Sequence, residues 1–242
     1  SVTHIQKSAF YLNRNLISIT IPEGVTSIED FTFYLCYNLT SISIPETVTS
    51  IGESAFGRCY DIPNIEIPNN VFFLGNSAFY ECTSLTSIRI PDKLTSIGEL
   101  TFFQCENLST VANFDQIISI GASAFSECES LAETPIGSNT TFIGREAFAQ
   151  CAELVDVSIP NSVTSIGNFA FGACSNLTSM SFGSQVTLFE ADVLIGCPIT
   201  ALDVDPLNPN FQIQDGILFT RELRSVVFYP TTKSNSTYSI PD

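Results

Sequence analysis

Hydrophobic positions recur at a fixed interval along most of this chain, and short polar stretches separate them. One series is aromatic and comprises Phe10, Phe33, Phe56, Phe79, Phe102, Phe125, Phe148 and Phe171. A second series is mostly isoleucine and comprises Ile5, Ile28, Ile51, Leu74, Ile97, Ile120, Ile143, Ile166 and Phe189. The interval is about 23 residues, and a fixed period between about 20 and 50 residues is typical of a solenoid, in which each repeat forms one winding of the chain.

The order of residues within one period predicts the course of a single coil. Residues 85–90 alternate between apolar and polar, which predicts a short β-strand with its apolar side chains facing inward. Pro91 ends that strand, because proline cannot continue a hydrogen-bonded ladder. We expect Gly98 to form a tight corner with positive φ, and a brief helical turn over residues 102–105 to close the coil.

A single coil has too few inward side chains to form a core, so the neighbouring coils must supply the rest. We therefore predict a solenoid with a stack of parallel β-strands, short helical or 3₁₀ turns and about nine coils. These coils extend over residues 1–206 and share one continuous core.

The period breaks after residue 206. Residues 216–220 and 223–229 are apolar and are joined by Arg221 and Glu222, which predicts a β-hairpin with a short turn. We expect residues 207–242 to form an insert that covers the open end of the stack and leads into a further repeat at residues 238–242. Because the chain also opens inside a repeat, we expect it to be a fragment of a longer protein.

One repeat reads V-x-x-I-G-x-x-A-F-x-x-C-x-x-L-x-x-I-x-I-P-x-x, and its clearest copy covers residues 48–70. This string resembles the leucine-rich repeats of BspA-like (Treponema pallidum-type) surface proteins, and the resemblance extends from residue 2 to residue 206. It implies a leucine-rich-repeat solenoid that binds other proteins through its surface.

Cysteine recurs at the same interval, at Cys36, Cys59, Cys82, Cys105, Cys128, Cys151, Cys174 and Cys197. Stacked coils place equivalent Cα atoms within the range of a disulfide, but their parallel Cα–Cβ bonds keep the Cβ atoms too far apart for a bridge. Free cysteine is among the most buried residue types. We therefore expect eight reduced thiols that fill a column in the core, beside the column formed by Phe56, Phe79, Phe102 and Phe125.

The chain offers no constellation for catalysis, so we expect neither enzyme activity nor a cofactor. His4 is the single histidine, and no recurring acidic partner forms a general acid–base pair with it. No Cys-x-x-Cys spacing indicates zinc. Asp203, Asp205, Asn208 and Asp215 carry oxygen ligands, but their spacing fits no EF-hand calcium loop.

Charge narrows the classes of partner. The 242 residues include 25 Asp and Glu against 9 Lys and Arg, which gives a net charge of −16. This charge excludes a nucleic-acid ligand, because phosphates require a cationic surface, and no apolar run is long enough to insert into a membrane. The acidity favours a soluble monomer through self-repulsion, and the alternative is steering towards a basic patch on a protein partner.

Two sets of residues are candidates for protein binding. The first set departs from the serine that is the default of the strand face and comprises Glu66, Arg89, Glu133 and Asp156. The second set is aromatic, follows the repeated Phe or Cys and comprises Tyr34, Tyr37, Tyr60, Tyr80 and Phe103. Interface cores are enriched in aromatic side chains. The alternative for the first set is ordinary sequence drift. The alternative for the second set is that the rings only cover the phenylalanine column, and the solvent exposure of the rings distinguishes this from a binding patch.

We predict a cell-surface or secreted module that binds a protein ligand. The family resemblance implies adhesion to host matrix or plasma proteins, such as fibronectin or fibrinogen, or to other microbes. The alternative is an intracellular or structural repeat scaffold for protein–protein interaction, which the eight cysteines favour because a reducing compartment keeps them as thiols.

Overall fold

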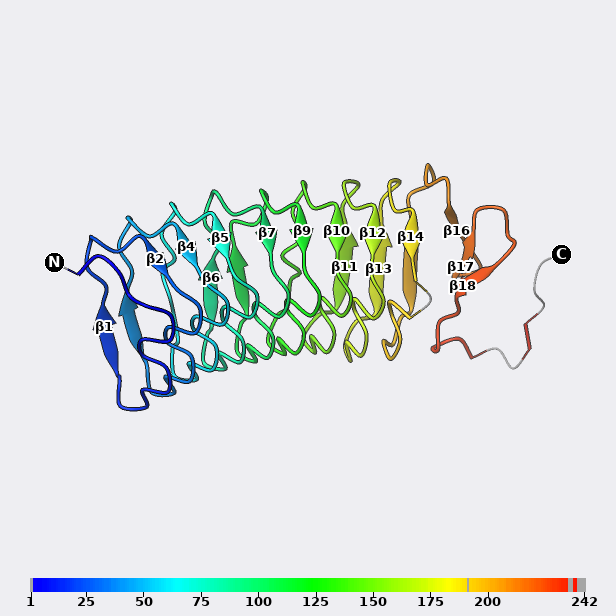
Figure 1. Cartoon of the computed structure of the whole chain (residues 1–242). Coiled ribbons are helices and arrows are strands. Elements are labelled where there is room, and N and C mark those ends of the chain that lie inside the picture. Colours follow the sequence, from blue (N-terminus) through cyan, green and yellow to red (C-terminus); the bar gives the residue numbers. More distant parts are fainter. Residues whose placement is uncertain (1, 191, 235–236, 239–242) are drawn as a thin grey trace.

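The computed structural model describes residues 2–190, 192–234 and 237–238, and the chain winds into an elongated solenoid. Strand β1 lies near one end and strands β16–β18 lie at the other (Figure 1). Strands of successive windings pair in parallel, and each residue faces the equivalent residue of the next repeat, as in the pairs Ile19↔Ile42 and Ile97↔Ile120. The predicted parallel solenoid is therefore confirmed.

Each winding passes through two faces that carry strands. Seven parallel strands of three or four residues form the long-strand face: β1 (Ser18–Thr20), β3 (Ser41–Ser43), β6 (Ser87–Arg89), β8 (Thr110–Ala112), β11 (Asp156–Ile159), β13 (Ser179–Phe182) and β15 (Ala201–Val204). The strands of two residues form the short-strand face: β2 (Ser27–Ile28), β4 (Ser50–Ile51), β5 (Phe73–Leu74), β7 (Ser96–Ile97), β9 (Ser119–Ile120), β10 (Phe142–Ile143), β12 (Ser165–Ile166) and β14 (Leu188–Phe189). We number coils 1 to 8 by these short strands, and partial windings flank them at both ends.

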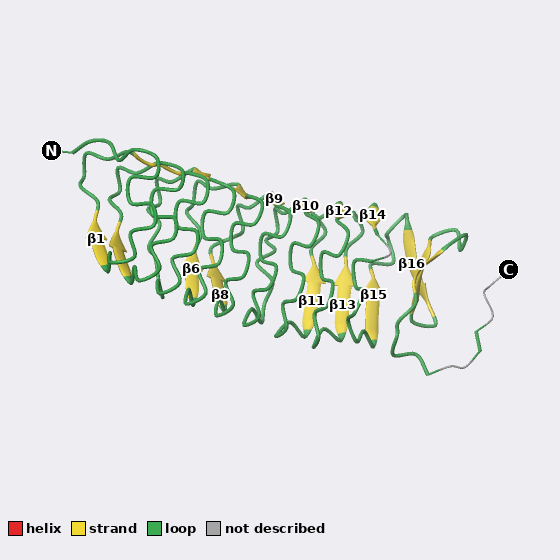
Figure 2. Ribbon diagram, turned by 60° about the horizontal axis from the view of Figure 1, so that its bottom comes forward, coloured by secondary structure: helices red, strands yellow, loops and turns green. Residues whose placement is uncertain are grey.

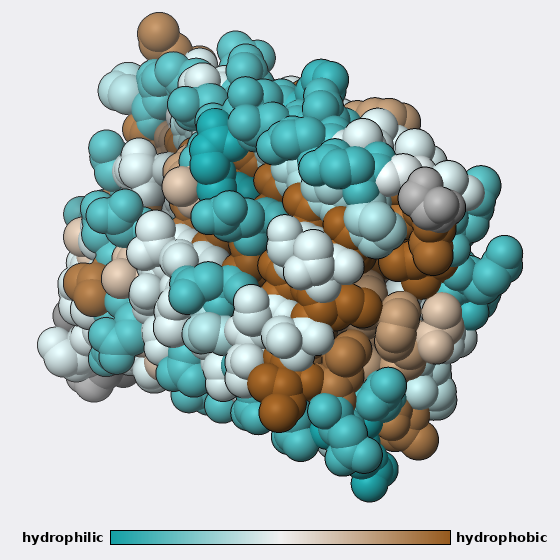
Figure 3. Space-filling view, turned by 90° about the vertical axis from the view of Figure 1, so that its left-hand side faces the viewer, coloured by the Kyte–Doolittle hydropathy of each residue, from teal (hydrophilic) through white to brown (hydrophobic). Residues whose placement is uncertain are grey.

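Phenylalanine rings form a continuous column through the core. From Phe10 to Phe171, the ring centroids of neighbouring coils are 5.2–5.5 Å apart and the rings are nearly parallel. Every ring from Phe33 to Phe171 is buried, and each covers the next. At the N-terminal end, Figure 3 shows apolar side chains at the surface, where Ile5 and Leu16 are half-buried against the core.

The segment that closes each coil is not helical. No helix occurs among the described residues, so the expected helical turn at residues 102–105 is wrong. Two residues per coil take positive φ instead, such as Leu100 at 56° and Gln104 at 55°. A left-handed residue interrupts a right-handed helix, and the backbone turns outward to the next coil: Phe102 N donates to Ala124 O at 2.8 Å. We call this segment of each coil the turn arc.

Gly98 does not take positive φ, contrary to expectation. Among the described glycines, only Gly196 and Gly216 do so. The repeated glycine lies where two coils approach closely: a Cβ atom on Gly75 would be 2.4 Å from Glu53 N, and one on Gly98 would be 2.5 Å from Asn76 Oδ1. At most positions of this series close backbone approach, and not the φ angle, requires glycine, whereas at Gly98 the nearest atom belongs to a side chain.

The ladder of the long-strand face is interrupted twice. Its sheets are β1–β3, β6–β8 and β11–β13–β15, and Figure 2 shows these blocks as separate groups of strands. Coil 3 and coil 6 contribute no long strand, and each carries a proline in the corresponding segment, Pro63 and Pro135. Proline has no N–H to donate to a ladder. Only the isolated bridge Asn64↔Ser87 connects coil 3 to β6.

Beyond β15 the chain forms an antiparallel sheet of β16 (Phe211–Gln214), β17 (Ile217–Thr220) and β18 (Val226–Phe228). The predicted hairpin corresponds to β17 and β18, but β16 was not expected. Asp215 and Gly216, both with positive φ, form the two-residue turn before β17, and Asp-Gly is a strong signal for such a turn. Of the further repeat expected at residues 238–242, residues 239–242 lie outside the described part.

Asn208 fastens this sheet to the last coil. Its side chain is 1% exposed, and Nδ2 donates to Gly183 O at 3.0 Å and to Val186 O at 3.1 Å. Its Oδ1 accepts from the backbone of Asn210 and Phe211 at 2.8 and 2.9 Å. The Asn208 amide oxygen is thus used within the fold, so its contribution is structural.

Removal of one ring from the phenylalanine column tests how tightly the coils depend on each other. Phe102→Ala is expected to lower the free energy of unfolding by about 3–5 kcal/mol, because the rings on both sides cannot close the cavity. Urea unfolding followed by circular dichroism measures this change. The matched control is Phe103→Ala, which removes a half-buried ring from the next position; an equal or larger loss there would contradict the column as the main source of stability.

A second pair of variants tests close approach at the repeated glycine. Gly75→Ala is expected to cost about 1–3 kcal/mol of unfolding free energy, because the added Cβ forces two coils apart. Ser77→Gly, two residues further on, replaces a residue at φ 57° and is expected to leave stability unchanged or higher. Equal stability of Gly75→Ala and the parent chain in urea would show that the coils do not need this contact.

Candidate functional site

The cysteine column lies in the core and joins neighbouring coils. All eight thiols are buried and free. Each donates a hydrogen bond to the carbonyl oxygen of the Phe 26 residues earlier, at 3.0–3.2 Å; the Cys59 thiol bonds Phe33 O in this way. Phe33 O also accepts from Cys36 N at 3.1 Å. Cysteine is thus both a small apolar filler and an inter-coil donor, and the sequence pattern indicated only the first role.

Burial makes the thiols of the inner coils chemically inert at neutral pH. It raises the pKa of Cys59, Cys105 and Cys128 well above the ordinary value and the pKa of Cys82 to about 12. The thiolate is the nucleophile and the metal ligand, and it does not form under these conditions. Within residues 2–190, 192–234 and 237–238, no group of three or more His, Cys, Asp or Glu side chains is placed to hold a metal ion.

The aromatic candidates lie on the turn arcs of the N-terminal half and stack across coils. Ring centroids are 5.0 Å apart in the pair Tyr37–Tyr60 and 5.3 Å apart in the pair Tyr80–Phe103. Tyr34, Tyr80 and Phe103 are all half-buried. Because the stacked rings cover each other's faces, those faces are not available to a partner. This arrangement favours a cover over the core rather than a set of anchors for a partner.

A charged cluster on the same arcs was not expected from the sequence. Arg58 Nη2 lies 3.0 Å from Glu81 Oε1, and Tyr60 Oη donates to Glu81 Oε2 at 3.2 Å. The Arg58 guanidinium also lies over the Tyr80 ring, 5.6 Å from its centroid. Its hydrogen bond to Glu81 raises the pKa of Arg58. Arg58 and Glu81 occupy the same slot in successive repeats, so opposite charges one repeat apart were the available signal.

The charged candidates all lie along the long-strand face, but only two of them come together. Glu66 and Arg89 line one hollow of about 610 Å³ at the interruption in coil 3. Glu133 is exposed at the second interruption, two residues before Pro135, and Asp156 is exposed at the start of β11. The structure therefore divides the predicted set into a site at coil 3 and isolated charges farther along.

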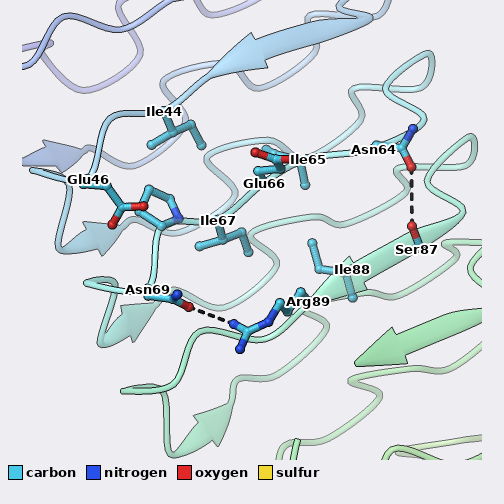
Figure 4. A pocket seen from close by; sticks show the side chains of 11 residues that line it. Ile44, Glu46, Asn64, Ile65, Glu66, Ile67, Asn69, Ser87, Ile88 and Arg89 are labelled. Atoms are coloured by element: carbon cyan, nitrogen blue, oxygen red, sulfur yellow. Dashed lines mark hydrogen bonds between the residues drawn. The ribbon is translucent and has the colours of Figure 1, made fainter. Parts of the chain in front are cut away.

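Three successive coils build the hollow at coil 3. Figure 4 shows Ile44 and Glu46 on one side, Glu66 near the middle, and Arg89 on the opposite side. Buried isoleucines of coil 3, such as Ile65, form its apolar part. The hollow therefore combines apolar contact with charged groups at its edges.

Charge in the hollow is unevenly balanced. Arg89 donates to Asn69 Oδ1 at 2.7 Å and forms an ion pair with Asp92 at 2.9 Å. The hydrogen bond from Arg89 lowers the pKa of Asp92. No ion pair is formed by Glu46 or Glu66 with any residue that the structure describes. The free charge of the hollow is therefore negative.

The short-strand face carries exposed apolar side chains that were not singled out as a set from the sequence: Phe72, Phe73, Ile118, Phe142 and Leu188. Each stands where other coils have Ser or Thr, and this departure from the repeat was the signal that could have found them. Phe72 and Phe73 are 60% and 52% exposed and line a second hollow of about 390 Å³. No helix in the described residues has the length and apolar character needed to cross a bilayer.

The chain is similar to known leucine-rich repeat proteins. A family model described as BspA type leucine rich repeat region matches in six copies, over residues 3–132 and 101–217. A leucine-rich cell surface protein of Faecalibacterium prausnitzii A2-165 is 28% identical with a TM-score of 0.56, and the match covers 81% of this chain and 62% of that protein. The present chain thus spans less than two thirds of that structure. A T. pallidum leucine-rich repeat protein is 26% identical with a TM-score of 0.59, over 61% and 69% of the two chains. No curated protein matches this chain.

The raised thiol pKa values predict a loss of stability at alkaline pH. In the unfolded chain the thiols of Cys59, Cys82, Cys105 and Cys128 lose their protons near pH 8.5, whereas the folded chain retains them, so their contribution to stability is complete below that pH and falls as pH rises towards about 12. Each of these four thiols contributes a slope of about 1.4 kcal/mol per pH unit once the unfolded thiol is ionised. Urea unfolding between pH 8 and pH 10.5 measures this slope.

Cys82→Ala is the matched control for this pH dependence, because it removes one thiol and leaves every tyrosine and lysine in place. The unfolding free energy of this variant is expected to fall less steeply with pH than that of the parent chain, and the difference equals the contribution of one thiol. Ellman's reagent at pH 8 is expected to label no thiol in the folded protein and eight after denaturation. Rapid labelling of the folded chain, or identical slopes for the two proteins, would contradict the burial of these protons.

Proposed function

The chain belongs to the family of BspA-type leucine-rich repeat proteins, and we propose that it is an adhesin-like, non-catalytic module that binds a protein ligand at the cell surface or in secreted form. Its similarity to a leucine-rich cell surface protein supports this location. We propose host matrix or plasma proteins as the ligands and a monomer as the binding form.

The observation that carries this proposal is the charged hollow at coil 3. The rest of the long-strand face has mostly small polar side chains in register, such as Ser18↔Ser41 and Ser158↔Ser181, and small polar side chains rarely serve as binding hot spots. At coil 3, Glu66 and Arg89 replace such residues and border an apolar floor. A concave patch with an apolar floor and a few placed charges is what a protein anchor needs.

The net charge of −16 supports a partner with a basic surface. Complementary charge increases the rate of encounter and suppresses wrong partners. The unpaired carboxylates of Glu46 and Glu66 place negative charge at the hollow itself. The charge of the hollow and the net charge of the chain therefore both attract a basic ligand.

The eight thiols do not require an intracellular scaffold. Oxidation proceeds through an accessible thiolate, and burial in this column excludes both the thiolate and the oxidant. The cysteines are therefore compatible with an oxidising environment, and the main physical reason for an intracellular location loses its weight.

Binding to immobilised fibronectin and fibrinogen, measured by biolayer interferometry at 0.15 M salt, tests the proposed function. The double variant Glu66→Ser, Arg89→Ser restores the template residue at both positions and is expected to weaken binding at least tenfold. Tyr80→Ala, on the turn arc, is expected to change the affinity less than twofold.

The charge control is Glu106→Gln, which removes one negative charge from an exposed site outside the hollow. It is expected to bind like the parent chain. Failure of the parent chain to bind any matrix or plasma protein would remove the proposed ligand class, and a larger effect of Tyr80→Ala than of the double variant would move the site to the turn arcs.

A further inference from the structure

We propose that the interruption of the long-strand face at coil 3 binds an extended, basic segment of the protein partner through open backbone groups. This inference rests on the proposed function and specifies the form of the ligand. It follows from which hydrogen bonds coil 3 makes and which it lacks.

Coils 2 and 3 are joined on both sides of the interruption but not within it. Asp61 N donates to Tyr37 O at 3.2 Å before it, and Asn70 Nδ2 donates to Glu46 O at 2.9 Å after it. Between these points, no backbone hydrogen bond connects residues 40–45 with residues 62–69, all of which the structure describes. The two coils therefore form a gap with closed ends.

Pro63 accounts for the first missing bond. In neighbouring coils the residue of this slot donates to the coil before it: Thr40 N bonds Ile17 O at 2.9 Å, and Thr86 N bonds Pro63 O at 3.0 Å. Pro63 has no N–H, so the Thr40 carbonyl receives no such bond. The loss of this bond is a property of one residue, and restoring the template residue reverses it.

A second ladder bond is missing on the same side. Ile21 N donates to Ser43 O and Ile90 N donates to Ala112 O, both at 2.9 Å, but the equivalent Ile44 N and Glu66 O form no hydrogen bond with each other. On the other side of coil 3, pairing with coil 4 is limited to a single bridge, Asn64↔Ser87. Open strand edges of this kind are templates for an added extended chain.

The space beside these groups is large enough to be entered by a ligand. The hollow of about 610 Å³ adjoins another of about 370 Å³ that is lined by β3 together with Asn64 and Glu66. Ile44 and Glu66 line both, so the two hollows form a continuous depression over the gap. A segment lying in it can reach the backbone of coil 2 and of coil 3.

Charge and polarity define the sequence of that segment. Glu46 and Glu66 are exposed and form no described ion pair, whereas Arg89 is neutralised by Asp92. A bound segment therefore gains from Lys or Arg at positions that face the carboxylates. Alternate positions of an extended chain point to opposite sides, so apolar residues between the basic ones can lie against Ile44. The fitting ligand is an extended peptide that alternates basic and β-branched residues.

The probe is the blocked peptide acetyl-Ser-Lys-Val-Lys-Val-Ser-amide, titrated into the full chain by isothermal titration calorimetry. Pro63→Thr restores the backbone donor and is expected to weaken binding at least tenfold, because the gap closes on the Thr40 carbonyl. Glu66→Gln is expected to weaken binding three- to tenfold. Glu106→Gln, on the turn arc, is the matched charge control and is expected to bind like the parent chain.

Two altered peptides separate the contributions and do not depend on the folding of any variant. The same peptide with N-methylated valines loses backbone donors, and the peptide with Glu in place of Lys loses charge complementarity; both are expected to bind at least tenfold more weakly. Hydrogen exchange is expected to show added protection at residues 42–44 and 65–67 when the parent peptide is bound. Absence of binding, equal binding of the N-methylated peptide, or protection elsewhere would overturn the inference.

Different results would overturn the peptide site at coil 3 and the protein-binding function. If fibronectin or fibrinogen binds the chain but Pro63→Thr leaves that affinity unchanged and the peptide does not bind, the protein-binding function stands and the gap is not its site. If neither the proteins nor the peptide binds, both proposals fail. If the peptide alone binds, the gap is a peptide site and the proposed ligand class is wrong.

Discussion

The close parallel registration of each coil on the one before it is the constraint on which the whole structure depends. Adjacent strands in a sheet lie about 4.8 Å apart, and the coils keep this contact through the core and along most of both strand-bearing faces. Equivalent residues of successive coils are therefore stacked on each other. The residue type at each position of the repeat must be able to pack against, or hydrogen-bond to, the equivalent segment of the next coil. A phenylalanine ring can do so by stacking, as between Phe79 and Phe102 at 5.5 Å, and a thiol can do so by donating to the coil before it.

The same constraint explains why candidate binding sites occur where the sequence departs from the repeat. A substitution that removes a backbone donor, as at Pro63, breaks a ladder on one face while the columns of the core and the other face hold the coils together. The result is a local opening in a rigid frame. Rigid frames with a few irregular places are well suited to binding, because little conformational entropy is lost when a ligand enters a preformed site.

The regular columns, by contrast, hold groups that would be reactive in another setting. Eight thiols, a stack of tyrosines and an Arg–Glu pair are all engaged with adjacent coils. Their effect is to stabilise the stack, and buried groups of this type cost free energy unless they are paired. A side chain of a repeat protein that packs in a column with the equivalent residues of adjacent coils is therefore best interpreted as structural. A side chain that lies outside such a column is the better candidate for a functional role.

The sequence by itself determined the parallel solenoid, the inward columns and the hairpin of β17 and β18, because a fixed period repeated so many times admits one way of stacking. It identified Glu66 and Arg89 as departures but not that they border one hollow. The left-handed turn arcs, the close approach at Gly75 and the anchoring of β16 through Asn208 were decided only by the tertiary structure. These features depend on distances between coils that are far apart in the sequence, and a pattern of residue types along the chain does not contain those distances.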